Sequence, residues 1–262
     1  MCVLNELDNF YNDFTGEKFV IGKSLFNKPI YCFKVAVTNR PVIIFQYAIH
    51  AREYITTHLA LEQIKAHVLT KKAGTVYFIP AVNPDGIAIC NRDNPLYKAN
   101  GRGVDLNVNF DARWGTGKSN TTQRGSENYI GKFPFSEPET IALKEFTLKV
   151  KPDATVSYHS KGEEIYWQFF QKGKRAIRDL GLAQVVAKET GYNIKETPYS
   201  AGGYKDWCIE KLKIPALTIE VGSDLLSHPI KKEQLEFIYQ KNRNVVQVVT
   251  DYVWEKLCKK NL

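Results

Sequence analysis

Four short apolar runs, separated by stretches with helical periodicity, limit most strongly how this chain can fold. Runs that are apolar throughout, rather than alternating, are typical of strands buried on both faces of a sheet. Strands of this kind that alternate with helices along the chain favour an α/β architecture. The four runs are residues 42–47, 75–80, 154–158 and 216–221.

Weaker patterns complete the expected set of elements. Residues 19–22 and 30–35 are expected to form an antiparallel pair joined through Asn27 and Lys28. The 3.6-residue period predicts helices over the ranges 53–69, 138–150, 174–189, 203–212 and 232–259. Internal repeats and Pro/Gly-rich linkers are missing, so we expect one domain over residues 1–262. The aperiodic, glycine-rich segment 111–135 is expected to cover or shape a site, because compact domains rarely keep such a loop without a function.

The charge balance leaves two interpretations open. A net charge of +8 could favour an anionic partner, or it could reflect a lysine-rich solvated surface. Basic runs interleaved with aromatic residues are missing, as is zinc-finger spacing, so no nucleic-acid partner is expected. The five scattered cysteines include no CxxC pair, which indicates free thiols and a reducing compartment.

The chain as given shows no targeting signal. Its first residues lack a basic stretch followed by an apolar one, and no run approaches the length of a membrane span. We therefore expect a cytoplasmic protein without a membrane partner, with export by an unseen route as the alternative. The sequence makes no prediction of an oligomeric state.

Two histidines and a glutamate follow buried strands. His50 and Glu53 come just after the run 42–47, and His159 directly follows the run 154–158. The HxxE pair alone is weak evidence, because an isolated match is more often a structural histidine near a helix end. Together the three residues match the two-histidine, one-carboxylate set of hydrolytic zinc. We therefore predict one Zn²⁺ per chain, held by His50, Glu53 and His159.

Glu220 ends a fourth apolar run. A carboxylate is expensive to bury at such a position unless it has a task, and general base catalysis is the natural one. An ion pair with a neighbouring lysine or arginine is the alternative interpretation.

These residues stand in an order that resembles the zinc carboxypeptidase (carboxypeptidase A) superfamily over about residues 19–257. The resemblance implies a single α/β domain with a mixed, mainly eight-stranded twisted sheet flanked by helices on both faces. The motifs that carry it are His50-x-x-Glu53, Asn83-Pro84-Asp85-Gly86, Gly103-Val104-Asp105-Leu106-Asn107, His159 and Glu220.

The resemblance also implies roles for individual residues. Glu220 would be the general base, Tyr199 the mobile tyrosine that closes over substrate, and Arg102 the cation that polarises the scissile carbonyl. Arg52 and Asn107 would contact the substrate. Asn83 and Asp85 are expected to build a turn.

One departure from the family pattern affects the substrate. The usual Asn-Arg-Asn reads Asn107-Val108-Asn109 here, so the arginine that binds a substrate's terminal carboxylate is missing. Valine offers no hydrogen bond in place of the two-pronged guanidinium. Ordinary removal of a C-terminal amino acid is therefore not expected.

A second resemblance points to another substrate. Residues 97–102, 134–140 and 157–167 are similar to bacterial γ-D-glutamyl-diaminopimelate peptidases. This implies an acidic peptide or muropeptide substrate, whose carboxylates Lys161, Arg113 or Arg124 could bind, unless these are solvated side chains. Two alternatives remain: a metallocarboxypeptidase with atypical C-terminal specificity, and a non-catalytic protein that binds peptides or peptidoglycan.

Overall fold

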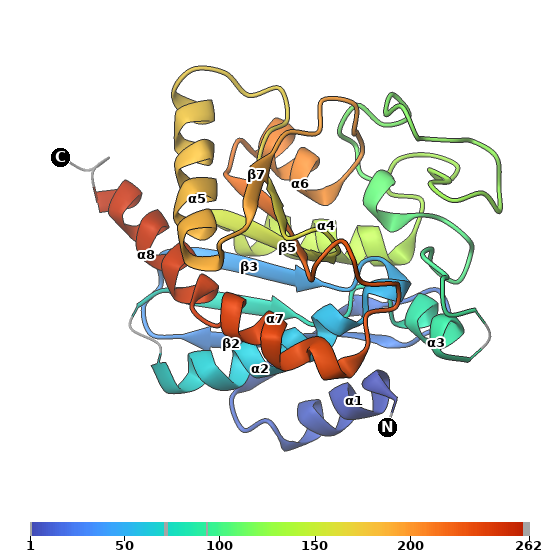
Figure 1. The fold of residues 1–262 in the computed structure, drawn as a ribbon, viewed down its shortest axis with the longest axis horizontal. Helices are drawn as coiled ribbons and strands as arrows, with labels where there is room; N and C mark the ends of the chain where they lie inside the picture. Colours follow the sequence, from blue (N-terminus) through green and yellow to red (C-terminus); the bar gives the residue numbers. More distant parts are fainter. Residues whose placement is uncertain (1, 71–72, 93, 259–262) are drawn as a thin grey trace.

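A mixed sheet of eight strands runs through the molecule (Figure 1). The structure is a computed structural model, and it describes residues 2–70, 73–92 and 94–258. The strands lie in the order β1-β2-β4-β3-β5-β8-β6-β7, which confirms the expected mixed sheet. They are β1 (Glu17–Lys23), β2 (Pro29–Ala36), β3 (Val42–Tyr47), β4 (Thr75–Ile79), β5 (Ala154–Ser160), β6 (Glu164–Tyr166), β7 (Asn193–Lys195) and β8 (Ala216–Val221).

The four apolar runs form the parallel centre of the sheet. Strands β4, β3, β5 and β8 are adjacent and parallel, so their carboxyl ends lie at one edge. The predicted pair β1 and β2 is antiparallel and extends the sheet beyond β4. On the other side β6 runs antiparallel to β8, and β7 is parallel to β6. The carboxyl edge of the centre is where an open α/β sheet places its ligands.

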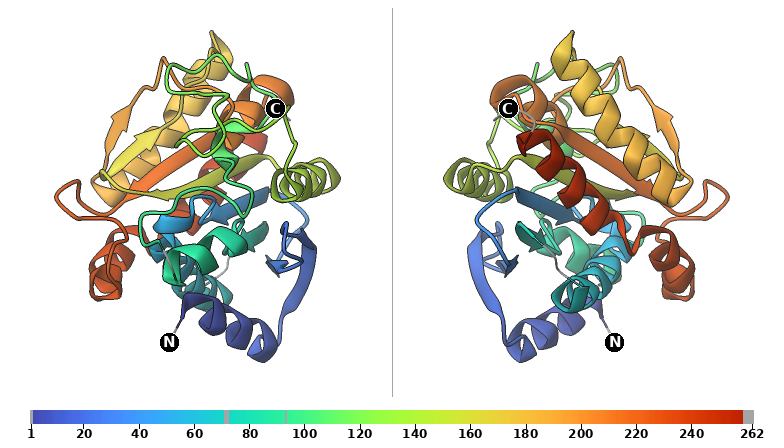
Figure 2. Two further views of the ribbon diagram at one scale, coloured as in Figure 1. Left: turned by 90° about the vertical axis from the view of Figure 1, so that its right-hand side faces the viewer. Right: turned by 90° about the vertical axis from the view of Figure 1, so that its left-hand side faces the viewer.

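Helices cover both faces of the sheet, as Figure 2 shows. One apolar core joins α1, α2, α5, α7 and α8 to the sheet, and the other joins α4 and α6 to its opposite face. The helices are α1 (Val3–Asp13), α2 (Ile55–Thr70), α3 (Pro84–Arg92), α4 (Pro138–Val150), α5 (Lys174–Thr190), α6 (Tyr204–Trp207), α7 (Leu235–Asn242) and α8 (Val245–Cys258). Among the helices of the described residues, none is both long and apolar enough to cross a membrane.

The single helix expected over residues 232–259 is wrong. A 3₁₀ turn (Lys232–Gln234) leads into α7. Helix α7 ends at Asn242, and α8 begins at Val245. The carbonyl of Asn242 accepts a hydrogen bond from Gln63 Nε2 at 2.8 Å, and the Asn242 amide donates to Tyr192 at 2.9 Å. A buried side chain of α2 thus uses the carbonyl that a continuous helix would need. The last residue of the expected helix, Lys259, lies outside the described residues.

Asn83 and Asp85 have structural roles, although they begin helix α3 rather than an isolated turn. Asn83 Oδ1 accepts a hydrogen bond from the backbone N–H of Gly86 at 2.9 Å, a capping interaction at the helix start. Asp85 Oδ2 accepts from the backbone N–H of Phe26 at 2.7 Å. The second of these bonds joins α3 to the loop between β1 and β2.

Candidate active site

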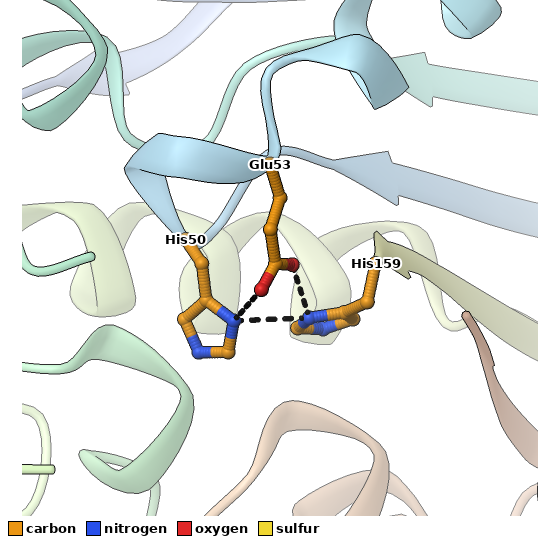
Figure 3. A group of neighbouring side chains, drawn as sticks. All are labelled: His50, Glu53 and His159. Atoms are coloured by element: carbon orange, nitrogen blue, oxygen red, sulfur yellow. Dashed lines mark hydrogen bonds and ion pairs between the residues drawn. The ribbon is translucent and has the colours of Figure 1, made fainter. Parts of the chain in front are cut away.

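Three side chains from two segments meet at the carboxyl edge of the sheet (Figure 3). His50 lies three residues after β3, and Glu53 ends the 3₁₀ turn Ala51–Glu53 that leads into α2. His159 belongs to β5, the parallel neighbour of β3. The turn is closed by a hydrogen bond from the Glu53 N–H to the His50 carbonyl at 3.2 Å, which aims both side chains at His159.

The ligand atoms of the three residues converge. Nδ1 of His50 and Nδ1 of His159 each lie 2.9 Å from a different carboxylate oxygen of Glu53, and the two nitrogens are 3.1 Å apart. The exposed fractions of His50, Glu53 and His159 are only 7%, 4% and 2%, so bulk water is largely excluded. The structure brings together the whole ligand set that the sequence predicted.

This donor set fits a zinc ion. Two imidazole nitrogens and one carboxylate are the protein ligands of catalytic zinc, which leaves a further position open. Four ligands placed about 2.1 Å from a tetrahedral zinc lie about 3.4 Å from one another, close to the separations found here. Without a cation, the Glu53 carboxylate would be buried between two imidazoles. A divalent ion would satisfy all three residues at once.

Asp105 fixes the orientation of the first histidine. Its Oδ1 lies 3.1 Å from His50 Nε2, and its Oδ2 forms an ion pair with Lys98 Nζ at 2.8 Å. Burial opposes the charged imidazole, but Glu53 and Asp105 outweigh it and raise the pKa of His50 to about 9. A carboxylate behind a ligating histidine is the usual second contact of a zinc site, because it fixes which nitrogen binds the metal.

Glu220 lies beside this centre on the neighbouring strand. Strands β5 and β8 are in register at His159 and Glu220. Burial raises the pKa of the Glu220 carboxyl well above its ordinary value, and the negative charge of Glu53 raises it further. The Glu220 carboxyl group forms no hydrogen bond or ion pair with any residue that the structure describes, so the alternative of a lysine or arginine partner has no support there. A carboxyl group in this state can exchange a proton with a reacting molecule.

A cleft of about 490 Å³ opens beside His50. Asn107 and Val108 form part of its wall, and Tyr199, which is 72% exposed, lies at its rim. The carboxamide oxygen of Asn107 accepts a hydrogen bond from the Tyr204 N–H at 3.2 Å, which fixes this wall to the start of α6. The aperiodic segment 111–135 contributes Lys118, Ser119, Asn120 and Asn128 to the lining.

Arg102 does not line this cleft. Its Nε pairs with Glu137 Oε2 at 3.1 Å, and the side chain faces a neighbouring cavity of about 540 Å³. Arg52 lines the same cavity and pairs with Glu127 at 2.8 Å. Arg102 lies in a loop that turns at Gly103, which has a φ of +83°. The direction of its side chain depends on this turn, which the spacing of the sequence motifs does not predict.

The other predicted substrate contacts already have acidic partners. Lys161 Nζ lies 2.8 Å from Asp224 Oδ1 and 2.6 Å from the Asp224 carbonyl. Arg113 Nε lies 3.1 Å from Glu210, and its guanidinium stacks on the Phe170 ring at 3.4 Å. Neither residue lines the cleft beside His50.

Lys98 is the cation that the sequence reasoning missed. It lines the cleft beside His50, and its side chain is only 17% exposed. Its backbone carbonyl accepts a hydrogen bond from the Ala51 N–H at 2.9 Å, which attaches the loop to the metal-binding turn. The only available signal was its place in the segment 97–102, already noted for its resemblance to the diaminopimelate peptidases.

Residues 3–245 match the family model described as zinc carboxypeptidase. The chain belongs to this family. A zinc carboxypeptidase with an intact ligand set is expected to bind zinc, which agrees with the donors described above.

Individual relatives are similar over most of the chain. The γ-D-glutamyl-L-diamino acid endopeptidase 1 of Lysinibacillus sphaericus is 26% identical over 257 residues, covering 84% of this chain. The chain spans 64% of that relative's length.

Solved structures show the same fold. Bovine thrombin-activatable fibrinolysis inhibitor, solved with a tick carboxypeptidase inhibitor, has a TM-score of 0.86 at 22% identity and covers 97% of both chains. Murein-tripeptide amidase MpaA from Escherichia coli O157 has a TM-score of 0.66 at 22% identity, covering 94% of this chain and 95% of that one.

Zinc removal is expected to destabilise the protein, because the metal binds the folded state alone. At free zinc a hundredfold above Kd the stabilisation is about 2.7 kcal/mol, which for a chain of this size corresponds to about 5–10 °C in Tm. Calorimetry with and without a chelator measures the shift. A His159→Ala variant should melt at the same temperature in both conditions; a chelator effect that persists in this variant would place the stabilising metal elsewhere.

Proposed function

We propose that this chain is a zinc-dependent peptidase that hydrolyses the bond between γ-D-glutamate and diaminopimelate in peptides derived from peptidoglycan. The observation that carries the proposal is the juxtaposition of three buried metal ligands with the half-buried carboxyl group of Glu220 at one edge of the sheet. A protein that only binds peptides has no use for an unpaired, partly desolvated carboxyl group beside a metal site.

The chemistry divides among the residues of the site. Bound zinc activates water and polarises a carbonyl group. Glu220 takes the proton from the attacking water and then delivers it to the departing amine. Lys98 stabilises the negative charge that develops on the carbonyl oxygen, the role expected of Arg102 from the sequence. Tyr199 lies at the rim and is free to close over the substrate.

Val108 separates this protein from ordinary carboxypeptidases. It lines the cleft where the family pattern has an arginine, so the guanidinium that would bind a terminal carboxylate is missing there. The endopeptidase named above acts, by its name, on γ-D-glutamyl-L-diamino acid bonds. Both points support cleavage of a γ-D-glutamyl bond to a diamino acid rather than removal of an ordinary C-terminal amino acid.

Product masses test the proposal. The zinc-loaded protein is incubated with L-Ala-γ-D-Glu-diaminopimelate and, separately, with an N-terminally blocked dipeptide that has a free C-terminus. We expect L-Ala-D-Glu and free diaminopimelate from the first and no products from the second. Cleavage of the dipeptide alone would reject the cell-wall substrate.

A metallocarboxypeptidase of atypical specificity is the second candidate, because one observation favours it. The cleft contains a lysine, Lys118, that could bind a terminal carboxylate in place of the missing arginine. Under this alternative, Val108→Arg should raise kcat/KM for simple C-terminal substrates by about tenfold or more, the value of one charge-assisted contact. Under our proposal the variant gains nothing on such substrates, and kinetics with the blocked dipeptide separates the two.

A further inference from the structure

Two charged side chains of the cleft have no charged partner among the residues that the structure describes. Lys118 and Glu196 both line the cavity beside His50, and neither forms an ion pair or a side-chain hydrogen bond with a described residue. Among the other titratable residues that line the cleft, His50 is a metal ligand, and Lys98 and Asp105 are paired with each other at 2.8 Å. The free charges of the cleft are therefore one cation and one anion.

The two residues belong to one continuous wall. The backbone N–H of Lys118 donates to the carbonyl of Tyr199 at 2.9 Å, and the Asn120 amide donates to the carbonyl of Ala201 at 3.2 Å. The ammonium group of Lys118 also lies 5.8 Å from the centre of the Tyr199 ring. These contacts fasten the segment around Lys118 to the segment that follows Glu196, so both charges are presented to the same space.

One cation and one anion in the same cleft are complementary to a zwitterion. Diaminopimelate carries an ammonium group and a carboxylate together on its distal carbon, whereas lysine carries only the ammonium group. In a longer peptide the other carboxyl group of diaminopimelate is part of an amide bond and needs no cation. A single lysine is therefore enough for such a substrate, which agrees with the valine at position 108.

We propose that Lys118 and Glu196 bind the distal carboxylate and the distal ammonium group of diaminopimelate, and so select it over lysine as the residue released. The proposal rests on the function proposed above and adds the residues that set its specificity. Lys118 would also supply the cation that is missing at Val108. Lys161 and Arg113 do not supply it, because they are paired with Asp224 and Glu210 outside the cleft.

Kinetics with two matched substrates tests the assignment. We would measure kcat/KM for L-Ala-γ-D-Glu-meso-diaminopimelate and for L-Ala-γ-D-Glu-L-Lys, with the native protein and with Lys118→Met, Glu196→Gln and Lys172→Met. Lys172 is an exposed lysine that does not line the cleft, which makes its variant a matched control. Zinc content and Tm of each variant confirm that the fold is intact, and Lys118→Gln replaces any Lys118→Met protein that does not fold.

Each variant is expected to respond differently. The native protein should prefer the diaminopimelate peptide by about tenfold, the value of one charge-assisted hydrogen bond. Lys118→Met should remove this preference by slowing only the diaminopimelate peptide. Glu196→Gln should slow both peptides, because both carry the distal ammonium group, and Lys172→Met should change neither. Binding of both peptides to a Glu220→Gln protein, measured by calorimetry, should show the same preference without turnover.

Other outcomes overturn the inference. Equal kcat/KM for the two peptides in the native protein would leave the proposed function intact and reject the selection by Lys118 and Glu196. An equal loss on both peptides in Lys118→Met would assign Lys118 to the carboxyl group that both substrates share. Failure of the native protein to cleave or bind either peptide would reject the proposed function, and this inference with it.

Discussion

Replacement of Glu220 by glutamine should lower kcat by about 10²–10⁴-fold, the range for loss of a general acid–base group. Glutamine has nearly the same shape but cannot accept the proton of the attacking water. Glu220 lies beside the metal ligands without being one of them, so zinc content and Tm should stay at the native values. Steady-state kinetics and metal analysis on the same samples measure both effects.

Glu164 offers a matched control. It lies on β6 directly opposite Glu220 in the sheet, and its carboxylate accepts a hydrogen bond from the Tyr166 hydroxyl. Glu164→Gln therefore changes a nearby carboxylate that has no task in the mechanism, and kcat should stay within about threefold of native, as surface changes of about ±0.5 kcal/mol allow. Substantial turnover by Glu220→Gln, or an equal loss in both variants, would remove Glu220 from the mechanism.

Replacement of Lys98 by methionine should lower kcat by about 10²–10³-fold, the usual cost of losing one group that stabilises a developing oxyanion. Burial opposes the charge on Lys98, but Asp105 raises its pKa, so the side chain remains a cation throughout the neutral range. If Lys98 acts in the transition state, kcat should fall while KM changes little.

Two further variants separate this role from a structural one. Lys98→Arg keeps the charge and the ion pair with Asp105, so it should recover part of the activity that Lys98→Met loses. A lower Tm without a change in kcat in Lys98→Met would instead show that Lys98 only supports Asp105. Arg102→Met tests the residue that sequence reasoning favoured. A large loss of kcat in that variant, together with an active Lys98→Met protein, would return the role to Arg102.

The centre of the fold could be predicted because burial on both faces leaves a plain apolar signature in β3, β4, β5 and β8. The short strands β6 and β7 have three residues each, too few to show a period. The break between α7 and α8 depends on a hydrogen bond from Gln63 to Asn242, 179 positions along the chain. Interactions of that range leave no local pattern.

Some residues of the site could likewise be predicted from the sequence, and others could not. His50, Glu53, His159 and Glu220 could be predicted because each directly follows or ends a buried strand, so the sheet itself brings them together. Lys98 and Arg102 lie in one loop, and their positions depend on how that loop turns at Gly103 and bonds to Ala51. The sequence shows two nearby cations but not which of them faces the cleft.

We propose that hydrolysis requires one zinc ion bound by His50, Glu53 and His159. Titration of the metal-free protein with zinc, while cleavage of L-Ala-γ-D-Glu-diaminopimelate is followed, tests it most directly. Activity should rise linearly and level off at one zinc per chain, and a His159→Ala protein should stay inactive across the same range. Full activity in the metal-free protein, or equal activation of His159→Ala, would contradict the account.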